Sequence, residues 1–317
     1  MTDLVTFGET MIRLSPPDDE RLETTTELEV RAAGAESNVA VAAARLGTEA
    51  VWTSKLPDSP LGRRVTSELE SYGLETDPVL SDEGRQGTYY IEFAGEPRGT
   101  DVIYDRADAA VTTARAEELP IERIRESEWF YTSGITPALS DTLEETTEEL
   151  LRAAREARTK TAFDLNYRSK LWSPAAARET LTGLFEHVDV LVTAVRDARN
   201  VLDATGDREA IARELADEWG FETVVLTLGA EGALAVHDGD LTRQSAFETE
   251  TLDPIGTGDA FVGAFLAKRI GGGDIGGALE YGAATAALKR TIPGDIAVVT
   301  SVEVESVIDT AESGISR

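Results

Sequence analysis

The sequence predicts an α/β protein in three layers, with helices on both faces of a mostly parallel central sheet and a small second β-sheet beside it. Strand-like apolar runs alternate with helix-like segments over most of the 317 residues, which is typical of a parallel sheet covered by helices. Two stretches, at about residues 9–33 and 85–110, break this rhythm. The length allows one large domain or two, and no repeat, low-complexity segment or interdomain linker is present.

The strands of the central sheet are expected where apolar residues run together without a helical period. These runs are residues 4–7, 50–53, 129–132, 161–163, 188–192 and 223–226. Capping residues mark the helices between them. The signals are Gly47 after residues 36–46, Ser140 before a helix towards Arg158, Ser173 with Pro174, and Asp207 before a helix to Trp219.

The two excursions carry short alternating polar and apolar runs, which indicate strands. Residues 89–93 and 101–105 are typical of an antiparallel pair around a turn at residues 95–97. Together with residues 9–33 they could form a small sheet that projects from the main layer. The alternative is that they are ordinary edge strands of the central sheet.

Acidic residues outnumber basic ones by 59 to 30 along the whole chain, which gives a formal net charge of −29. The lysines are Lys55, Lys160, Lys170, Lys268 and Lys289. Dense carboxylates with few lysines predict a protein kept soluble in a salt-rich cytoplasm, as in a halophilic archaeon, and argue against nucleic acid as a partner. We expect no signal peptide, no membrane span and, with no cysteine, no disulfide, and therefore a cytoplasmic protein.

Residues 253–261, Asp-Pro-Ile-Gly-Thr-Gly-Asp-Ala-Phe, are typical of a loop that enters a helix. Gly256 and Gly258 let the backbone turn tightly and approach a ligand, and the N–H groups of a first helical turn suit a phosphate. Asp259 in that turn could take a proton from a hydroxyl, while the turn holds the phosphoryl group that the hydroxyl attacks. The alternative is a helix with an ordinary acidic first turn.

Three other segments place polar or glycine residues where a ligand could bind. They are Gly34 with Asn38 at the start of a helix, Asn166 with Arg168 after a strand, and Thr227 with Gly229 and Gly232 after another strand. Carboxyl ends of parallel strands are usual ligand sites, and an arginine can hold a carboxylate or phosphate through two hydrogen bonds. Each segment also has a structural interpretation, as a helix cap, a surface salt bridge and a simple turn.

Three common motifs are missing. No lysine follows a glycine, which excludes a P-loop. The first strand leads into Gly8-Glu9-Thr10-Met11, so the dinucleotide fingerprint is missing too. His187 and His237 lie far apart in sequence, and neither a histidine-based metal site nor a catalytic triad is expected.

Together these segments resemble the ribokinase-like (PfkB) family of sugar kinases over nearly the whole chain. The most specific element is Gly256-Thr257-Gly258-Asp259, which is similar to the family's Gly-Ala-Gly-Asp motif. Within the family, residues 34–40, 104–106, 164–172 and 287–295 are similar to 2-keto-3-deoxygluconate kinases. The resemblance implies a single kinase domain over residues 1–317, with a ribokinase-like α/β/α fold in which the two excursions form a β-sheet lid.

The resemblance also implies a role for each candidate residue. Asp259 is the catalytic base, and Gly256, Thr257 and Gly258 form the anion hole. The sugar acid is bound by Gly34, Asn38, Tyr89, Tyr104, Arg106 and Arg168. ATP is bound by Asn166, Arg168, Asp197, Thr227, Gly229, Gly232, Gly256 and Gly258. Mg²⁺ is held through phosphates and water near Asp197, with no direct protein ligand. Ala194 stands where the family has the asparagine of an Asn-x-x-Glu motif, so the amide of that motif is missing here and only the carboxylate of Asp197 is kept.

The function implied is ATP-dependent phosphorylation of 2-keto-3-deoxygluconate at its terminal hydroxyl, in Entner-Doudoroff-type sugar degradation, with the galactonate epimer as a further substrate. The alternatives are a kinase for a neutral sugar such as fructose or ribose, and a sugar- or nucleotide-binding regulator without catalysis. A redox enzyme is disfavoured by the missing fingerprint. The resemblance also implies a dimer formed through the lid, or an assembly of such dimers.

Overall fold

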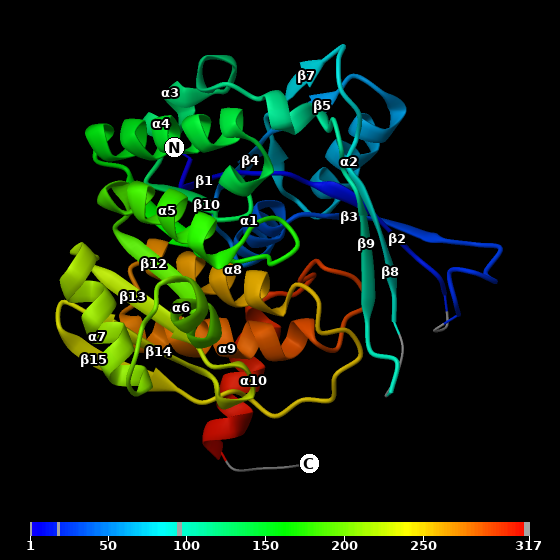
Figure 1. Cartoon of the computed structure of the whole chain (residues 1–317). Coiled ribbons are helices and arrows are strands. Elements are labelled where there is room, and N and C mark those ends of the chain that lie inside the picture. Colours follow the sequence, from blue (N-terminus) through cyan, green and yellow to red (C-terminus); the bar gives the residue numbers. More distant parts are fainter. Residues whose placement is uncertain (1, 18–19, 94–96, 314–317) are drawn as a thin grey trace.

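Alternating side chains build the central sheet, because successive residues of a strand point to its opposite faces. The computed structural model of the protein describes residues 2–17, 20–93 and 97–313. Within these residues the sheet has nine strands in the order β15-β14-β13-β12-β11-β10-β1-β4-β6 (Figure 1). Only the neighbours β13–β14 and β14–β15 are antiparallel; the others run parallel. The prediction of a mostly parallel sheet is confirmed.

Six of these nine strands lie close to the predicted runs, whereas residues 75–76, 233–237 and 240–244 were not predicted as strands. The nine strands are β1 (Leu4–Phe7), β4 (Ala50–Thr53), β6 (Glu75–Thr76), β10 (Trp129–Ser133), β11 (Lys160–Asp164), β12 (Val190–Ala194), β13 (Thr223–Thr227), β14 (Ala233–His237) and β15 (Asp240–Gln244). β12 starts two residues later than predicted. Asp189 precedes it as a linker, and its carboxylate accepts a hydrogen bond of 3.0 Å from the backbone N–H of Thr161 at the edge of β11.

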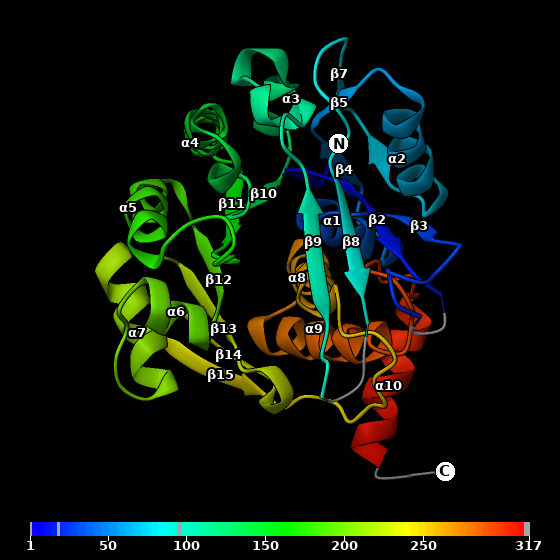
Figure 2. The same cartoon turned by 45° about the vertical axis from the view of Figure 1, so that its right-hand side comes forward.

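Helices cover both faces of the sheet. They are α1 (Ala35–Arg45), α2 (Pro60–Ser71), α3 (Ile121–Arg125), α4 (Asp141–Ala157), α5 (Pro174–Leu184), α6 (Val195–Val201), α7 (Arg208–Trp219), α8 (Thr257–Ile270), α9 (Ile275–Lys289) and α10 (Ser301–Ser313). Figure 2 shows α4, α5 and α7 on one side of the strands and α1, α8 and α9 on the other. The three-layer prediction is confirmed.

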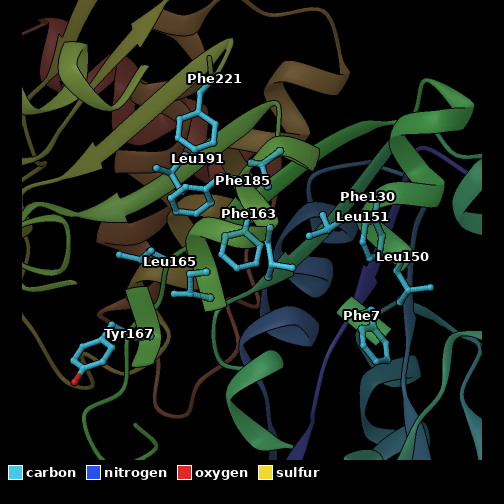
Figure 3. Packing of buried hydrophobic residues seen from close by; sticks show 14 of the residues in the cluster. Phe7, Phe130, Leu150, Leu151, Phe163, Leu165, Tyr167, Phe185, Leu191 and Phe221 are labelled. Atoms are coloured by element: carbon cyan, nitrogen blue, oxygen red, sulfur yellow. The ribbon is translucent and has the colours of Figure 1, made fainter. Parts of the chain in front are cut away.

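Two buried clusters hold the layers together. Along β1, Val5 and Phe7 face the cluster under α4, α5 and α7, whereas Leu4 faces the cluster under α1, α8 and α9. Figure 3 shows the first cluster, in which Phe163 and Phe185 meet edge to face with their ring centroids 6.5 Å apart. Burial of such apolar surface is the main stabilising term of the fold.

A separate sheet of four strands stands beside the central one. Its order is β3-β2-β8-β9, with bounds β2 (Met11–Ser15), β3 (Glu29–Ala33), β8 (Thr88–Glu92) and β9 (Asp101–Asp105). A short parallel pair, β5 (Lys55–Pro57) and β7 (Val79–Ser81), lies next to α2 (Figure 1). The strands at residues 88–105 are therefore not edge strands of the central sheet. Most of the turn predicted at residues 95–97 lies outside the described residues.

The predicted helix ends agree with the structure. The hydroxyls of Ser140 and Ser173 and the carboxylate of Asp207 accept hydrogen bonds from the first turns of α4, α5 and α7, as N-caps do. Arg158, after α4, takes the left-handed conformation that closes a helix. In the described part of the chain, no helix combines the length and the apolar character that crossing a bilayer requires.

Candidate active site

A cavity of about 850 Å³ lies between the small sheet, the carboxyl ends of β11, β12 and β13, and the first turns of α1 and α8. Its lining includes Gly34, Asn38, Tyr89, Tyr104, Arg106, Asn166, Arg168, Asp197, Thr227, Gly256, Thr257, Gly258 and Asp259. Segments separated by more than 200 residues therefore meet in one place. Among the predicted site residues, Gly229 and Gly232 do not line this cavity.

The glycine-rich loop turns sharply into α8. Gly256 caps the helix with a φ of +75°, and a β-carbon there would collide with the carbonyl oxygen of Asp295, so both conformation and space require glycine. The side chain of Thr257 donates a hydrogen bond of 2.7 Å to the carbonyl of Pro254. A β-carbon at Gly258 would meet nothing within 4 Å, and Gly258 lines the cavity. The start of α8 is thus a rigid turn with its backbone accessible.

The carboxylate of Asp259 lies in the first turn of α8 and lines the cavity. Its Oδ2 accepts a hydrogen bond of 2.7 Å from Nδ2 of Asn38, and it makes no ion pair with any described residue. Desolvation raises the pKa of Asp259 to about 6, while the Asn38 hydrogen bond and the charges of Arg168 and Lys289 oppose this rise. Above that pH the group is an ionised carboxylate and can accept a proton.

A second carboxylate, Asp164, ends strand β11 in the same cavity. Burial and the nearby charge of Asp259 raise the pKa of Asp164 to about 7. One of its oxygens accepts a hydrogen bond of 3.1 Å from the backbone N–H of Asn166, which holds Asn166 at a φ of +39°. A left-handed conformation at a residue other than glycine is strained, and such strain occurs mostly at functional sites.

Two side chains on neighbouring segments bring opposite charges to this part of the cavity. Arg168 is exposed on the lining, and its charge lowers the pKa values of both Asp164 and Asp259. The carboxylate of Asp197 is buried and accepts a hydrogen bond of 2.9 Å from Nε of Arg196. Ala194, which replaces the family's asparagine, lines the cavity beside Asp197. Arg168, unlike Asp197, has no ion-pair partner among the described residues.

Arg106 lines the cavity but is not a free cation. Its Nη2 donates a hydrogen bond of 2.7 Å to Oε2 of Glu9, and its guanidinium carbon lies 5.0 Å from the ring centroid of Tyr104. Burial raises the pKa of Glu9, and the charge of Arg106 opposes that rise. Oε1 of Glu9 and Nε of Arg106 are buried without a partner in the described structure. Of the two residues, only Arg106 lines the cavity, so we expect the unpartnered Nε to be the hydrogen-bond donor nearer to a ligand.

The small sheet is joined to the α8 loop by a buried polar network. Tyr89, from β8, donates its hydroxyl proton to Asp295 across 2.7 Å. Arg13, from β2, donates to Asp295 and also to Asp253 at 3.1 Å. Tyr89, which the family resemblance implies contacts the sugar acid, lines the cavity, but its hydroxyl is engaged with Asp295.

The remaining predicted residues are Gly34 and Asn38, which line the cavity, and Gly229 and Gly232, which do not. A β-carbon at Gly34 would collide with the carbonyl oxygen of Glu9, which explains a glycine at the start of α1. Oδ1 of Asn38 is buried and has no partner among the described residues, so it can accept a hydrogen bond from a ligand. Gly229 and Gly232 lie in the turn between β13 and β14, and Gly232 is required there because a β-carbon would collide with the carbonyl oxygen of Gln244.

The sequence interpretation did not assign a role to Glu9, Asp164 or Asp295. Asp164 stands at the carboxyl end of a predicted strand, two residues before Asn166, and its position could have identified it. Glu9 pairs with a residue 97 positions away and Asp295 with one 282 positions away. No local pattern in the sequence predicts pairings over such distances along the chain.

The arrangement has the parts that phosphoryl transfer needs: an ionisable base, a helix N-terminus for an anion, and cationic side chains. For a hard cation such as Mg²⁺, the cavity offers oxygen ligands on Asp164, Asp197 and Asn166. In the described residues there is no group of three or more Asp, Glu, His or Cys side chains placed to hold a metal by themselves. These donors fit a cation that keeps its ligands mainly from phosphates and water.

Comparisons with known proteins agree with this geometry. The model of the pfkB family of carbohydrate kinases matches residues 1–301. A 2-dehydro-3-deoxygalactonokinase from Haloferax volcanii is 63% identical over 315 residues, 99% of each chain, in keeping with the predicted halophilic origin. A 2-dehydro-3-deoxygluconokinase from Thermoproteus tenax is 31% identical over 93% of this chain and 90% of its own length.

The fold comparison gives the same result. The crystal structure of a 2-dehydro-3-deoxygluconokinase from Thermotoga maritima superimposes with a TM-score of 0.92 at 35% identity and covers 98% of this chain and 100% of its own. The ribokinase-like architecture predicted from the sequence is thereby confirmed. The chain belongs to the pfkB family of carbohydrate kinases.

Proposed function

We propose that the protein transfers the γ-phosphoryl group of ATP to the terminal hydroxyl of a 2-keto-3-deoxy sugar acid and forms the 6-phosphate ester. The observation that carries this proposal is Asp259: a carboxylate without an ion-pair partner in the described structure, placed in the first turn of α8 and lining the same cavity as Arg106 and Arg168. The names of relatives at 63%, 35% and 31% identity support the sugar-acid class.

In the proposed reaction Asp259 takes the proton of the terminal hydroxyl. The hydroxyl oxygen forms a bond to the γ-phosphorus, the bond from that phosphorus to the bridging oxygen breaks, and ADP leaves. Asn38 stabilises the ionised form of Asp259, because its amide donates to the carboxylate. A base with a pKa of about 6 is ionised at neutral pH and still close enough to that pH to accept a proton in the transition state.

The start of α8 would bind the charge that develops on the transferred group. The first N–H groups of a helix have no acceptor within the helix and attract anions. We expect the turn of Gly256, Thr257 and Gly258 to act as the anion hole, with Gly258 leaving space for close approach. The N–H of Thr257 donates at 3.3 Å to the carbonyl of Pro254, so the neighbouring N–H groups would contribute most.

Recognition of the acid group is assigned to Arg106 and Arg168. A guanidinium group matches the planar geometry of a carboxylate, which a neutral hexose lacks. Glu9 holds one side of Arg106 and leaves Nε without a partner in the described structure. Gly34, Asn38 and Tyr104 complete the proposed sugar side of the cavity.

The ATP side would be formed by Asn166, Asp197 and Thr227 together with Arg168. Gly229 and Gly232 are still predicted to contact ATP, through a part of the nucleotide that extends beyond the cavity. Mg²⁺ bound with ATP would neutralise phosphate charge, and Asp164 and Asp197 would hold it through water. We also propose a cytoplasmic location, because the reaction consumes ATP.

Both epimers are proposed as substrates. Relatives named for the galactonate and the gluconate compound are each similar over nearly the whole chain. One inverted hydroxyl changes a pocket's preference only modestly unless a buried group depends on it. We further propose that residues 1–317 form one kinase domain whose small sheet closes over the cavity as a lid, and that two copies pair through this sheet.

The product tests the proposal. Wild-type protein incubated with ATP, Mg²⁺ and 2-keto-3-deoxygluconate or its galactonate epimer should yield ADP and a sugar monophosphate. Phosphorus NMR should show coupling of the new phosphate to the protons of C6. Phosphate on another carbon, or ADP formed without a phosphorylated sugar, would contradict the assignment of the terminal hydroxyl.

A further inference from the structure

Lys289 is a buried cation that the proposed reaction does not use. It is the last residue of α9, and its side chain is 0% exposed. Lysine is almost never fully buried unless its charge is compensated, because removing an ammonium group from water is costly. The contacts that compensate for the burial of this ammonium group therefore have to be identified.

The ammonium group contacts backbone and not a carboxylate. Nζ donates hydrogen bonds of 3.2 Å to the carbonyl of Asp253 and of 3.1 Å to the carbonyl of Ile292. Among the described residues no carboxylate oxygen lies within 4.0 Å of Nζ. Lys289 is therefore not half of a direct ion pair, and no single carboxylate neutralises its charge locally.

Asp253, whose carbonyl Lys289 holds, fixes the loop that enters α8. Its Oδ1 accepts a hydrogen bond of 2.9 Å from the N–H of Ile255, and its Oδ2 accepts one of 2.9 Å from the N–H of Gly294. Gly256 follows directly and packs against the carbonyl of Asp295. The ammonium group thus ties the end of α9 to the loop that sets the direction of the first turn of α8.

Charge gives a second, independent effect. The nearby charged groups are Asp253, Asp295 and Arg13, and the field of Lys289 reaches Asp259, where it lowers the pKa of the proposed base. In a site of low dielectric constant such a fixed charge acts strongly on developing negative charge. A methionine of similar length would avoid the cost of burial but would supply neither the charge nor the hydrogen bonds.

We propose that Lys289 is a positioning residue for phosphoryl transfer: its ammonium group holds the loop before α8 in place and adds a fixed positive charge beside the anion-binding turn. This inference rests on the proposed kinase function. It requires that the charge and the N–H donors at this position act together, so that a small amine should replace the lost side chain.

The experiment compares Lys289→Ala with Lys55→Ala in purified full-length protein, with ATP and the 2-keto-3-deoxy acid as substrates. Lys55 is the matched control, because it is also buried and also absent from the cavity lining, but it pairs with the carboxylate of Glu118 at 2.9 Å. Each is assayed alone and with ammonium, methylammonium or tetramethylammonium chloride at constant ionic strength. Thermal unfolding and ATP binding, measured by calorimetry, show how much of each variant is folded and competent to bind.

Lys289→Ala should lose about 10²-fold or more in kcat, as when one oxyanion-hole donor is removed, with ATP binding largely kept. Ammonium and methylammonium should raise the kcat of Lys289→Ala at least about tenfold. Tetramethylammonium, which cannot donate a hydrogen bond, should not. Lys55→Ala should keep its kcat and not respond to amines.

The inference fails if folded Lys289→Ala keeps kcat near that of the wild type, or if no amine recovers its loss. Either outcome leaves the kinase function intact as long as the wild type is active. A wild type without activity on any sugar acid would instead contradict the proposed function.

Discussion

Nδ2 of Asn38 donates a hydrogen bond of 2.7 Å to Oδ2 of Asp259 and so joins the first turns of α1 and α8, 221 residues apart in the chain. The two helices pack against the same face of the central sheet. Because the bond stabilises the ionised carboxylate, it lowers the pKa of Asp259 against the rise that desolvation causes. The contact therefore controls the pH range in which the proposed base is active.

Replacement of Asn38 by alanine should move this range. Without the amide donor, the pKa of Asp259 rises further above about 6, and a higher pH is needed to ionise it. The acid limb of the kcat/KM profile should shift upward by about one pH unit, roughly the effect of one lost charged hydrogen bond, and activity should partly recover at alkaline pH. The measurement is a pH–rate profile of wild type and Asn38→Ala. An unshifted limb would show that the bond does not set the ionisation.

Asp259→Asn should abolish turnover while keeping ATP binding. Asparagine preserves the size of the side chain but cannot take a proton, so kcat should fall by about 10³-fold or more. Single-turnover ADP release measures the loss, and calorimetry measures ATP binding. Asp274→Asn is the matched control, because Asp274 caps α9 outside the cavity and asparagine also caps helices. Similar losses in both variants would contradict the role of Asp259.

Arg106→Ala should weaken binding of the sugar acid and leave ATP unaffected. Loss of a charge-assisted hydrogen bond should raise KM for the acid about 10- to 100-fold. The matched control is Arg85→Ala, which breaks the exposed pair with Asp105 near the end of β9. Steady-state kinetics with each substrate varied in turn give the two KM values. Equal increases for acid and ATP would indicate general disorder of the small sheet.

Glu36→Gln should stabilise the protein at alkaline pH. Glu36 is 1% exposed, and burial raises its pKa from 4.5 to about 7, although Ser133 and Thr136 donate hydrogen bonds to its Oε1. Between these pH values the folded state holds a proton that the unfolded state has lost, so stability falls as pH rises. Above pH 7 the penalty amounts to about 3 kcal/mol.

Glutamine keeps the acceptor oxygen and has no charge to bury. The difference in free energy of unfolding between Glu36→Gln and wild type should therefore be under about 1 kcal/mol at pH 5 and grow to about 3 kcal/mol at pH 8. Denaturant titrations at the two pH values provide the test. A difference that does not change with pH would show that Glu36 ionises as easily in the folded state as in the unfolded one.

Local patterns in the sequence predicted six of the nine strands of the central sheet and several segments of the cavity lining. Continuous apolar runs predicted six of the strands, because a strand buried on both faces needs apolar side chains on both; β6, β14 and β15 were not predicted. The glycines and Asp259 predicted the start of α8, because a φ of +75° at Gly256 is a backbone requirement that local sequence encodes.

Long-range pairings could not be predicted in the same way. Arg106 was expected to be available to substrate, and the structure pairs it with Glu9. Tyr89 was expected to contact substrate, and its hydroxyl is bound to Asp295. The carboxylate that pairs with a given arginine or tyrosine is determined by how the two sheets pack. The spacing of residues along the chain does not predict that packing.

The most direct test of the central claim is ADP release by the wild-type protein in concentrated salt, with one sugar at a time. The panel consists of 2-keto-3-deoxygluconate, its galactonate epimer, gluconate, fructose and ribose. A carboxylate recognised by Arg106 and Arg168, with Asp259 as base, predicts that kcat/KM for one or both 2-keto-3-deoxy acids exceeds that for fructose and ribose by at least about 10²-fold. A neutral sugar phosphorylated as efficiently as the acids would contradict the account.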